Sequence, residues 1–351
     1  MSSFAESDIL KLDSLLRGQG PVCIAVHIHP DGDAIGSATA LARFLRSHCG
    51  RDARIVVNDP PPETLDFLSW EGLVADASRQ PQEARELIAS ASLLICLDMN
   101  EFKRAGSLAP ALADSGATKI LIDHHLDPDR AYFDLVFSRT DISSTCELLY
   151  SLLTSLPGVE DAASLGPEVV TPLMTGMTTD TNNFANSVFP STLVMASELL
   201  AAGVDRDAIL LHLYNSYREN RLRAMGYCLS DLMKISPEGV AVIVMDGGTL
   251  RRFDLQDGET EGFVNLPLSL AKVRMSILLK EDEGFFRVSL RSRPDVAANE
   301  LASACFHGGG HRCASGGRLY FPGDIADPSL AQDYVMNAAA RFMRGEMPLE
   351  Q

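Results

Sequence analysis

The stretch VCIAVHIHPDGDAIGS, residues 22–37, decides which fold the sequence predicts for the first half of the chain. Apolar and other residues alternate over 22–29, which is typical of a strand and places His27 and His29 on one face near its end. Asp31 and Asp33 follow, and a helix is expected from about residue 34 to residue 48, with Gly36 allowing close packing. A strand that passes through a polar turn into a helix is typical of parallel α/β sheets, which bind ligands at the carboxyl ends of their strands.

The rest of the first half repeats this alternation. Further strands are predicted at 53–58, 93–98 and 117–123. Helical stretches are predicted around 82–90 and from Ser144, which has capping-box spacing to Glu147. Strands that alternate with helices predict a parallel α/β sheet.

The second half of the sequence changes in texture. It is almost wholly helical from about 167 to 231, and a turn follows at 236–239. The next segments predict a smaller α/β domain with strands at 239–246, 273–281, 285–293 and 318–321 and helices near 296–305 and 328–344. The expected organisation is therefore a larger domain over 1–220, a helical linker over 221–238 and a smaller domain over 239–347.

The charge balance limits the class of partner. The chain has 30 basic and 47 acidic residues, a formal net charge of −17. A surface this negative argues against binding along long duplex DNA, because such binding depends on basic patches. It is compatible with a small phosphorylated substrate, because bound cations can dominate the local field.

Composition also predicts the cellular compartment. No apolar run approaches the roughly 20 residues that span a bilayer, so no membrane association is expected. The N-terminus resembles a short amphipathic helix with acidic residues rather than a secretory signal. The seven cysteines contain no CxxC pair, which argues against structural zinc and a disulfide framework. We therefore expect a cytoplasmic protein with reduced thiols.

Carboxylates and imidazoles gather where the predicted strands end. Asp98 ends one strand, and Asp123 ends another and is followed at once by His124 and His125. A further carboxylate, Asp180, lies in the segment 175–184. A single histidine or aspartate at such a place is usually structural, but burying this many carboxylates without counter-charge would be very costly. The pattern predicts a metal centre, and its mixed oxygen and nitrogen donors suit Mn, Fe or Co, with Mg as an alternative.

These segments resemble the motifs of the DHH phosphoesterase superfamily, in its branch with a C-terminal DHHA1 domain. HIHPDGDAIGS (27–37), LDMNEFKRAG (97–106), LIDHHLDP (121–128) and TGMTTDTNNF (175–184) resemble its four motifs, in the family's order. SLRSRPDVAANELASACFHGGGHRCASGG (289–317) resembles the DHHA1 signature. The resemblance covers about residues 20–320. It implies a parallel-sheet DHH domain joined by a helical linker to a smaller α/β domain.

The resemblance implies a site with two divalent metal ions. We expect Mn²⁺, with Mg²⁺ or Co²⁺ as alternatives. Asp98 would bridge the two ions, and His29 does not occupy a ligand position. The ligands implied for one ion are His27, Asp31 and Asp98, and those for the other are Asp33, Asp98, His124 and Asp180.

The resemblance also implies roles beside the metals. His125 would face the phosphate, and Asp123 would fix the orientation of an imidazole. A hydroxide that bridges the two ions would attack phosphorus in line, while the ions neutralise charge on the phosphoryl oxygens.

The resemblance also implies which residues contact the substrate. Arg104 in the second motif would reach a phosphate, since an arginine fork matches phosphate geometry. In the smaller domain the resemblance implies that a terminal nucleotide or its phosphate is bound by Arg291 and by the glycine turn HGGGH (307–311), through Gly309, Gly310 and His311. His307 departs from the glycine common at its position, and Ser315 departs from alanine.

The branch that the sequence resembles hydrolyses very short oligoribonucleotides (nano-RNA) to mononucleotides and 3'-phosphoadenosine 5'-phosphate (pAp) to AMP. We expect this activity and these partners. Three alternatives stay open: a phosphodiesterase for linear or cyclic dinucleotides, a pyrophosphatase or exopolyphosphatase, and a nucleotide-binding regulator without turnover. Base rates alone favour a homodimer.

Overall fold

A computed structural model describes residues 4–70, 72–256 and 258–346. The chain forms two compact units, and the boundary between them falls after Ser216. The sequence placed a separate helical linker at 221–238, whereas contacts group this stretch with the second unit because its segments pack on that unit's sheet. The expected end of the second domain, residue 347, lies outside the described residues.

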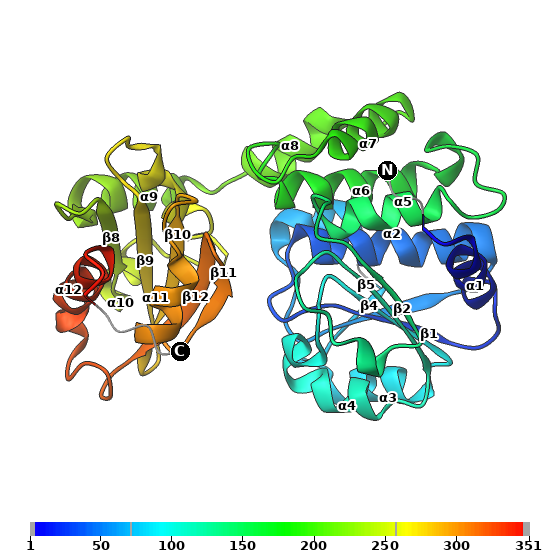
Figure 1. Cartoon of the computed structure of the whole chain (residues 1–351), viewed down its shortest axis with the longest axis horizontal. Coiled ribbons are helices and arrows are strands. Elements are labelled where there is room, and N and C mark those ends of the chain that lie inside the picture. The colour runs from blue at the N-terminus through cyan, green and yellow to red at the C-terminus, as the bar shows by residue number, and fades with distance from the viewer. Residues whose placement is uncertain (1–3, 71, 257, 347–351) are drawn as a thin grey trace. The chain divides into compact units, whose positions relative to one another are not determined.

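The first unit contains a six-stranded parallel sheet in the order β3-β2-β1-β4-β5-β6 (Figure 1). The parallel α/β architecture predicted from the sequence is therefore confirmed, although β3 and β6 were not anticipated. The strands are β1 (Val22–Ala25), β2 (Ala53–Val57), β3 (Val74–Asp76), β4 (Leu93–Leu97), β5 (Thr118–Asp123) and β6 (Leu135–Ser138).

Strand β1 is shorter than the predicted strand over 22–29. It ends at Ala25, and all four of its residues are buried. His29 has a positive φ of 50°, which is incompatible with an extended strand, so the chain has already turned at this point. The alternation over 22–29 therefore extended the predicted strand too far.

Helices cover both faces of this sheet (Figure 1). Val22 and Ile24 pack with helices of one layer, whereas Cys23 and Ala25 pack with those of the other. Burial on both faces explains why the strands are almost wholly apolar. The first layer contains α1 (Glu6–Leu16), α2 (Gly32–Cys49), α5 (Thr145–Leu153) and α6 (Pro167–Asp180), and the second contains α3 (Pro81–Ser90) and α4 (Ala109–Asp114).

Glycines allow α2 and α6 to pack closely. A Cβ added at Gly36 would lie 2.6 Å from the carbonyl oxygen of Pro172, and one at Gly32 would lie 2.4 Å from Oγ1 of Thr179. Larger residues would push the helices apart. The contact brings the start of α2, with Asp33, close to the end of α6, with Asp180. Two further helices, α7 (Pro190–Ala201) and α8 (Arg206–Tyr214), pack beside α6.

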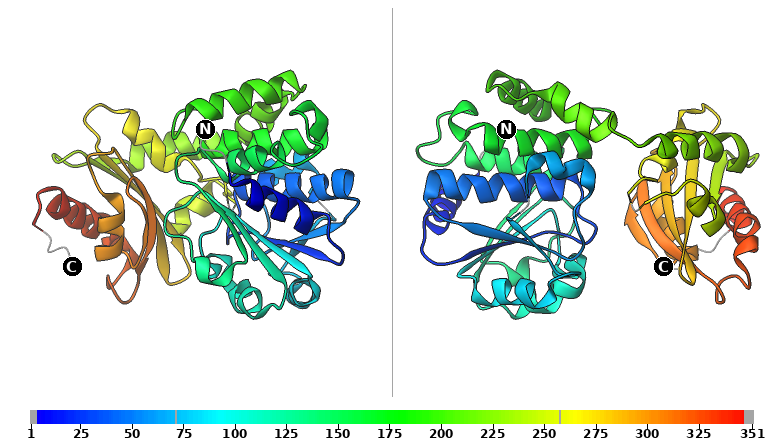
Figure 2. Two further views of the ribbon diagram at one scale, coloured as in Figure 1. Left: turned by 45° about the vertical axis from the view of Figure 1, so that its right-hand side comes forward. Right: turned by 180° about the vertical axis from the view of Figure 1, so that it is seen from behind.

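The second unit contains a six-stranded mixed sheet in the order β11-β12-β10-β9-β8-β7 (Figure 2). Only β8 and β9 pair in parallel; the other pairs are antiparallel. The strands are β7 (Lys234–Ile235), β8 (Val240–Met245), β9 (Met275–Asp282), β10 (Phe285–Ser292), β11 (Gly309–His311) and β12 (Ala314–Tyr320).

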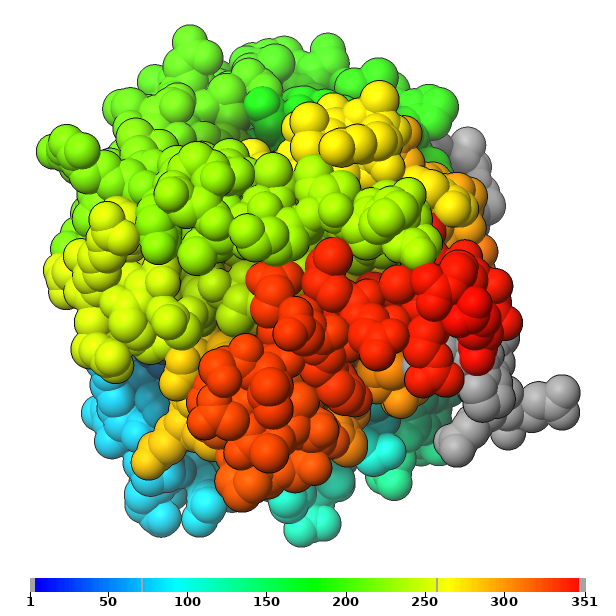
Figure 3. Space-filling view, turned by 90° about the vertical axis from the view of Figure 1, so that its left-hand side faces the viewer, coloured from blue at the N-terminus to red at the C-terminus, as the bar shows by residue number. Residues whose placement is uncertain are grey.

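This sheet also has helices on both faces. Helices α11 (Ala298–Cys305) and α12 (Ala331–Met343) pack on one face, over Val242 and Val288. The other face, over Ile243 and Leu278, is covered in part by α9 (Glu219–Tyr227), the π-helical turn η5 (Cys228–Leu232), α10 (Gly247–Arg252) and η6 (Phe263–Ser269). Figure 3 shows α12 in red and α9 in yellow-green on the surface of this unit.

The length and the apolar character of a helix decide whether it can span a membrane. Throughout the described ranges, none of the helices combines the length and the apolar character that crossing a bilayer requires.

Candidate metal centre

The candidate centre lies where the direction of strand order reverses, between β1 and β4. Such switch points are the usual ligand sites of open α/β sheets. His27 follows shortly after β1, and Asp98 directly follows β4. Asp98 has a positive φ of 58° and is 3% exposed. A non-glycine residue in this strained conformation is typical of functional sites, where the fold holds a side chain in place.

The two carboxylate oxygens of Asp98 face two different histidines. Oδ2 lies 3.3 Å from Nε2 of His27, and Oδ1 lies 3.5 Å from Nε2 of His124. Oδ1 also accepts a hydrogen bond from the hydroxyl of Thr145 at 3.1 Å. The carboxylate of Asp98 thus faces two groups of donor atoms, one around His27 and one around His124, as a bridging ligand must.

The first group contains His27, Asp31 and Asp98. Nε2 of His27 lies 3.8 Å from Oδ1 of Asp31. The other ring nitrogen, Nδ1, lies 2.7 Å from the carbonyl oxygen of Ile28, to which it can donate. In the neutral ring, that bond places the proton on Nδ1 and leaves Nε2 directed at the carboxylates, the tautomer that a metal ligand requires.

The second group contains Asp33, His124 and Asp180. Nε2 of His124 lies 3.6 Å from Oδ2 of Asp180 and 4.0 Å from Oδ2 of Asp33. Asp180 is the last residue of α6, and the three residues Asn182, Asn183 and Phe184 that follow shortly after all have positive φ. The chain therefore turns away sharply as soon as the carboxylate is in place.

The start of α5 fixes Asp33. The backbone amides of Thr145 and Cys146 donate to its two oxygens at 2.7 and 2.9 Å. These are amides of a helix N-terminus, which favours negative charge. Nothing in the residue types of Thr145 or Cys146 indicated this role; the capping signal at Ser144 located the helix start but not its neighbour.

Asp123 holds the imidazole of His125. Its Oδ1 lies 2.7 Å from Nδ1 of His125, and its Oδ2 accepts a bond from the backbone amide of the same residue at 3.0 Å. Asp123 is fully buried, so this pair has a fixed orientation. Nδ1 of His125 also lies 3.7 Å from Oδ1 of Asp98, and the donor atoms of Asp98, His124 and His125 form a third close group.

The centre concentrates negative charge without a basic side chain to balance it. In the described part of the chain, Asp31, Asp33, Asp98, Asp123 and Asp180 form ion pairs with histidines and with no lysine or arginine. Burial, and then the charge of Asp98, raise the pKa of Asp33 well above its usual value. Burial likewise raises the pKa of Asp180 to about 7. Carboxylates that repel one another in this way fit bound cations, which would restore their ionised form.

The same charges shift the pKa values of His124 and Asp98. Burial lowers the pKa of His124, but the bond to Asp98 and the charges of Asp98, Asp33 and Asp180 more than offset this and raise it to about 10. For Asp98, burial is outweighed by the bonds from His124 and His27, and its pKa lies well below the usual range. Proton and metal ion would therefore compete for the same imidazole nitrogens.

The structure also locates Arg104 and His29, the two other residues considered for this site. Arg104 belongs to the 3₁₀ segment η2 (Phe102–Leu108), and its carbonyl oxygen accepts a bond from the amide of Ile28 at 2.7 Å. The structure thus brings the second motif next to His27. His29, by contrast, is exposed and lies outside the three donor groups; its Nδ1 is 3.6 Å from Oδ2 of Asp59.

In the second unit, the residues expected to contact the substrate lie on the hairpin of β11 and β12 and on the neighbouring strand β10. Gly309 and Gly310 were expected in a glycine turn, but they lie in β11, which pairs with β12. In this register His311 is opposite Ala314, and Ala314 is opposite Arg291. Side chains of directly paired residues point to the same face, so only a methyl group separates His311 from Arg291 across the sheet.

His307, the departure noted in the sequence, pairs with a carboxylate. Its Nε2 lies 2.9 Å from Oδ1 of Asp324, and its ring lies 5.4 Å from that of Tyr320.

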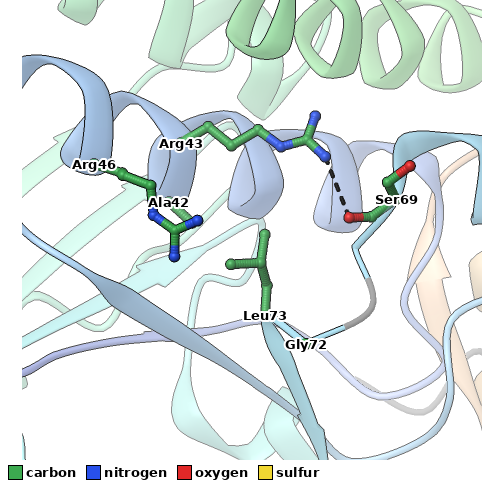
Figure 4. A pocket seen from close by; sticks show the side chains of 6 residues that line it. All are labelled: Ala42, Arg43, Arg46, Ser69, Gly72 and Leu73. Atoms are coloured by element: carbon green, nitrogen blue, oxygen red, sulfur yellow. Dashed lines mark hydrogen bonds between the residues drawn. The ribbon is translucent and has the colours of Figure 1, made fainter.

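A hollow elsewhere in the first unit does not contain the centre. It has a volume of about 320 Å³ and lies over the second half of α2. Arg43 reaches across it and donates to the carbonyl oxygen of Ser69 at 3.3 Å (Figure 4). None of the candidate ligands is among its lining residues, which are Ala42, Arg43, Arg46, Ser69, Gly72 and Leu73.

Comparison with known proteins identifies the family of the chain. The model of the "DHH family, N-terminal domain" matches residues 21–177. The chain is 32% identical to the bifunctional oligoribonuclease and PAP phosphatase NrnA of Thermus thermophilus, over 86% of this chain and 85% of the relative. It is 29% identical to the protein of the same name from Bacillus subtilis, over 87% of this chain and 91% of the relative.

A solved structure is similar over nearly the whole length. It is an exopolyphosphatase-related protein from Bacteroides fragilis, with a TM-score of 0.89 and 34% identity over 98% of this chain and 99% of that one. The chain therefore belongs to the DHH family, and it is a phosphoesterase.

Proposed function

We propose that the enzyme hydrolyses short oligoribonucleotides to mononucleotides and pAp to AMP, with two divalent cations held around Asp98. The observation that carries the metal assignment is the position of Asp98, whose two oxygens face His27 and His124 separately. His27, Asp31 and Asp98 would hold one ion, and Asp33, Asp98, His124 and Asp180 the other. The donors are oxygen and imidazole nitrogen, which suit Mn²⁺, our preferred ion, and also Mg²⁺ and Co²⁺.

When bound, the two ions would lower the pKa of a water molecule and neutralise charge on the phosphoryl oxygens. The chain supplies the remaining functions. Asp123 fixes the ring of His125 through a 2.7 Å contact at Nδ1. This leaves Nε2 of His125 as the atom that can donate to a phosphoryl or leaving oxygen. Asp33, anchored by the two amides of α5, keeps its position while charge develops.

The substrate assignment rests on the two relatives whose names describe both activities, together with the second unit. Arg291 and His311 occupy one row of the sheet, and Gly309 lies in the next row on the same face. An arginine fork, an imidazole and exposed backbone are suited to a terminal phosphate or nucleotide. We assign this role to Arg291, Gly309, Gly310 and His311, and a phosphate contact to Arg104.

A panel of substrates tests the proposal. The purified protein with Mn²⁺ would be incubated with a diribonucleotide, a 24-residue RNA, pAp, cyclic di-AMP and pyrophosphate, and the products would be separated by chromatography. We expect the dinucleotide and pAp to be hydrolysed fastest and the 24-residue RNA much more slowly. Preference for cyclic di-AMP or pyrophosphate would assign the enzyme to another phosphoesterase activity. Binding without turnover of any of the five would indicate a regulator.

A further inference from the structure

The antiparallel register of the second unit places a continuous set of polar and aromatic residues on one face of β10, β12 and β11. The even-numbered β10 residues Phe286, Val288 and Leu290 are buried beneath α11 and α12. The odd-numbered ones therefore point to the opposite face. We call the part of that face formed by β10, β12 and β11 the open face. Its residues are Phe285, Arg287, Ser289 and Arg291 on β10, Ala314, Gly316, Arg318 and Tyr320 on β12, and Gly309 and His311 on β11.

The open face has two different ends and a flat middle. One end is the row with Arg291, Ala314 and His311, already assigned to the terminal nucleotide. In the next row, Ser289 is opposite Gly316, and Gly316 is opposite Gly309. Two glycines and a serine leave this part of the sheet without a large side chain, so an extended ligand can lie close to the strands.

Beyond the glycines the sheet becomes basic. Arg287 is opposite Arg318 on β12 and opposite Lys280 on β9, so a single row across three strands has three cationic side chains. Arg287 and Arg318 are exposed. Arg287 pairs with Asp282 at 2.7 Å, and the Arg318 guanidinium lies 4.9 Å from the ring centre of Phe285. Like charges directly opposite each other destabilise a sheet. The chain as a whole has a net charge of −17, so a row of cations on this face requires a reason other than stability.

The far end of the open face is aromatic. Phe285 is opposite Tyr320, and their ring centres are 5.8 Å apart. Tyr320 is 37% exposed. The ring of His307 lies against it, and His307 is itself held by Asp324. Exposed aromatic rings beside arginines are the usual means by which proteins bind single-stranded nucleic acid, with bases stacked on the rings and phosphates beside the cations.

Length distinguishes the possible ligands. Phe285 and Arg291 are six residues apart on β10, which corresponds to about 20 Å at the usual rise of a strand. A single nucleotide bound at Arg291 would not extend this far, whereas an oligonucleotide would. We propose that the open face is a track for a single-stranded oligoribonucleotide, in which Arg287 and Arg318 contact an inner phosphate and Tyr320, supported by His307, stacks with a base beyond the terminal two.

This inference rests on the proposed function, and its test uses substrate length. The wild-type enzyme and the Tyr320→Ala, Tyr320→Phe and Arg318→Gln variants would be assayed with pAp, a dinucleotide and a pentanucleotide. We expect Tyr320→Ala and Arg318→Gln to raise KM for the pentanucleotide about tenfold, because stacking on an aromatic ring contributes about 1–3 kcal/mol per base. KM for pAp and for the dinucleotide should not change. Tyr320→Phe, which keeps the ring, should behave like the wild type.

Leu330→Ala provides a matched control, since Leu330 is an exposed residue of the same unit outside the open face. An equal rise in KM for all three substrates, or none for the pentanucleotide, would overturn the track. Equilibrium binding of a fluorescent pentanucleotide to the full chain in EDTA separates the two proposals. If turnover fails but Tyr320→Ala weakens this binding about tenfold, the track stands and the proposed reaction does not; wild-type and variant binding of equal strength would refute the track.

Discussion

The two candidate sites of this protein are assembled in different ways. In the first unit, donor atoms come from the ends of β1, β4 and β5 and from α2 and α6, and three of these side chains, those of His27, Asp33 and Asp98, are buried. In the second unit, the contact residues come from neighbouring strands of one sheet, and His311, Arg287 and Arg318 are exposed. The first arrangement depends on helix packing over long sequence distances, and the second depends on strand register.

This difference predicts how each site responds to change. No other residue can replace a buried carboxylate that faces two groups of donor atoms, because each lost contact leaves other charges in the site unbalanced. An exposed row on a sheet loses one contact at a time, and water replaces it. Substitutions in the first unit should therefore affect turnover and metal-dependent stability, and those in the second should mainly affect substrate affinity.

The largest effect is expected for Asp98→Asn. The amide keeps the shape of the side chain but removes the charge that both histidines face, so kcat for pAp should fall about 1000-fold or more. Phosphate release in the presence of Mn²⁺ measures this. Asp59→Asn is the control, because Asp59 lies outside the centre, where it accepts bonds from the amide of His29 at 3.0 Å and from the side chain of Asn58 at 3.1 Å; the activity of this variant should stay close to wild type. A D98N enzyme that retains most of its activity would refute the bridging role.

A smaller effect is expected on the stability of the first unit. Its free energy of unfolding should rise by about 2.7 kcal/mol when Mn²⁺ is present at 100 times its Kd. The only tryptophan of the chain, Trp70, lies in this unit, so its fluorescence reports this transition. The transition should move to higher temperature with Mn²⁺ and should not move in D98N. Equal shifts of the Trp70 signal and of the second unit, followed by calorimetry, would contradict a centre confined to the first unit.

The smallest effect is expected for Arg291→Ala. Loss of a charge-assisted phosphate contact should raise KM for pAp about tenfold and leave kcat within a few-fold of wild type. Steady-state kinetics separates the two parameters. Arg274→Ala is a suitable control, because Arg274 pairs with Asp295 at 2.7 Å in the same unit. A fall in kcat without a change in KM would place Arg291 in the chemical step and remove the contrast between the units.

The sequence predicted which long elements are present more accurately than it predicted where each of them begins and ends. Strong apolar runs identified β2, β4 and β5 to within a residue or two, because strands buried on both faces are apolar throughout. The three-residue strands β3 and β11 were missed, since so short a segment carries no periodic signal. The glycines of β11 were interpreted as a turn because glycine is disfavoured in isolated strands; pairing with β12 holds them extended.

By itself, the sequence determined which donor types follow the strands and in what order, because a strand that ends on aspartate must present it at one edge of a parallel sheet. Only the tertiary structure decided that Asp98 faces two histidines, that the amides of α5 anchor Asp33, and that His29 turns to Asp59 instead. These outcomes depend on the contact of α2 with α6 at Gly36 and on the left-handed backbone at Asp98. Both are products of packing between segments far apart in the chain, which no local pattern of residues specifies.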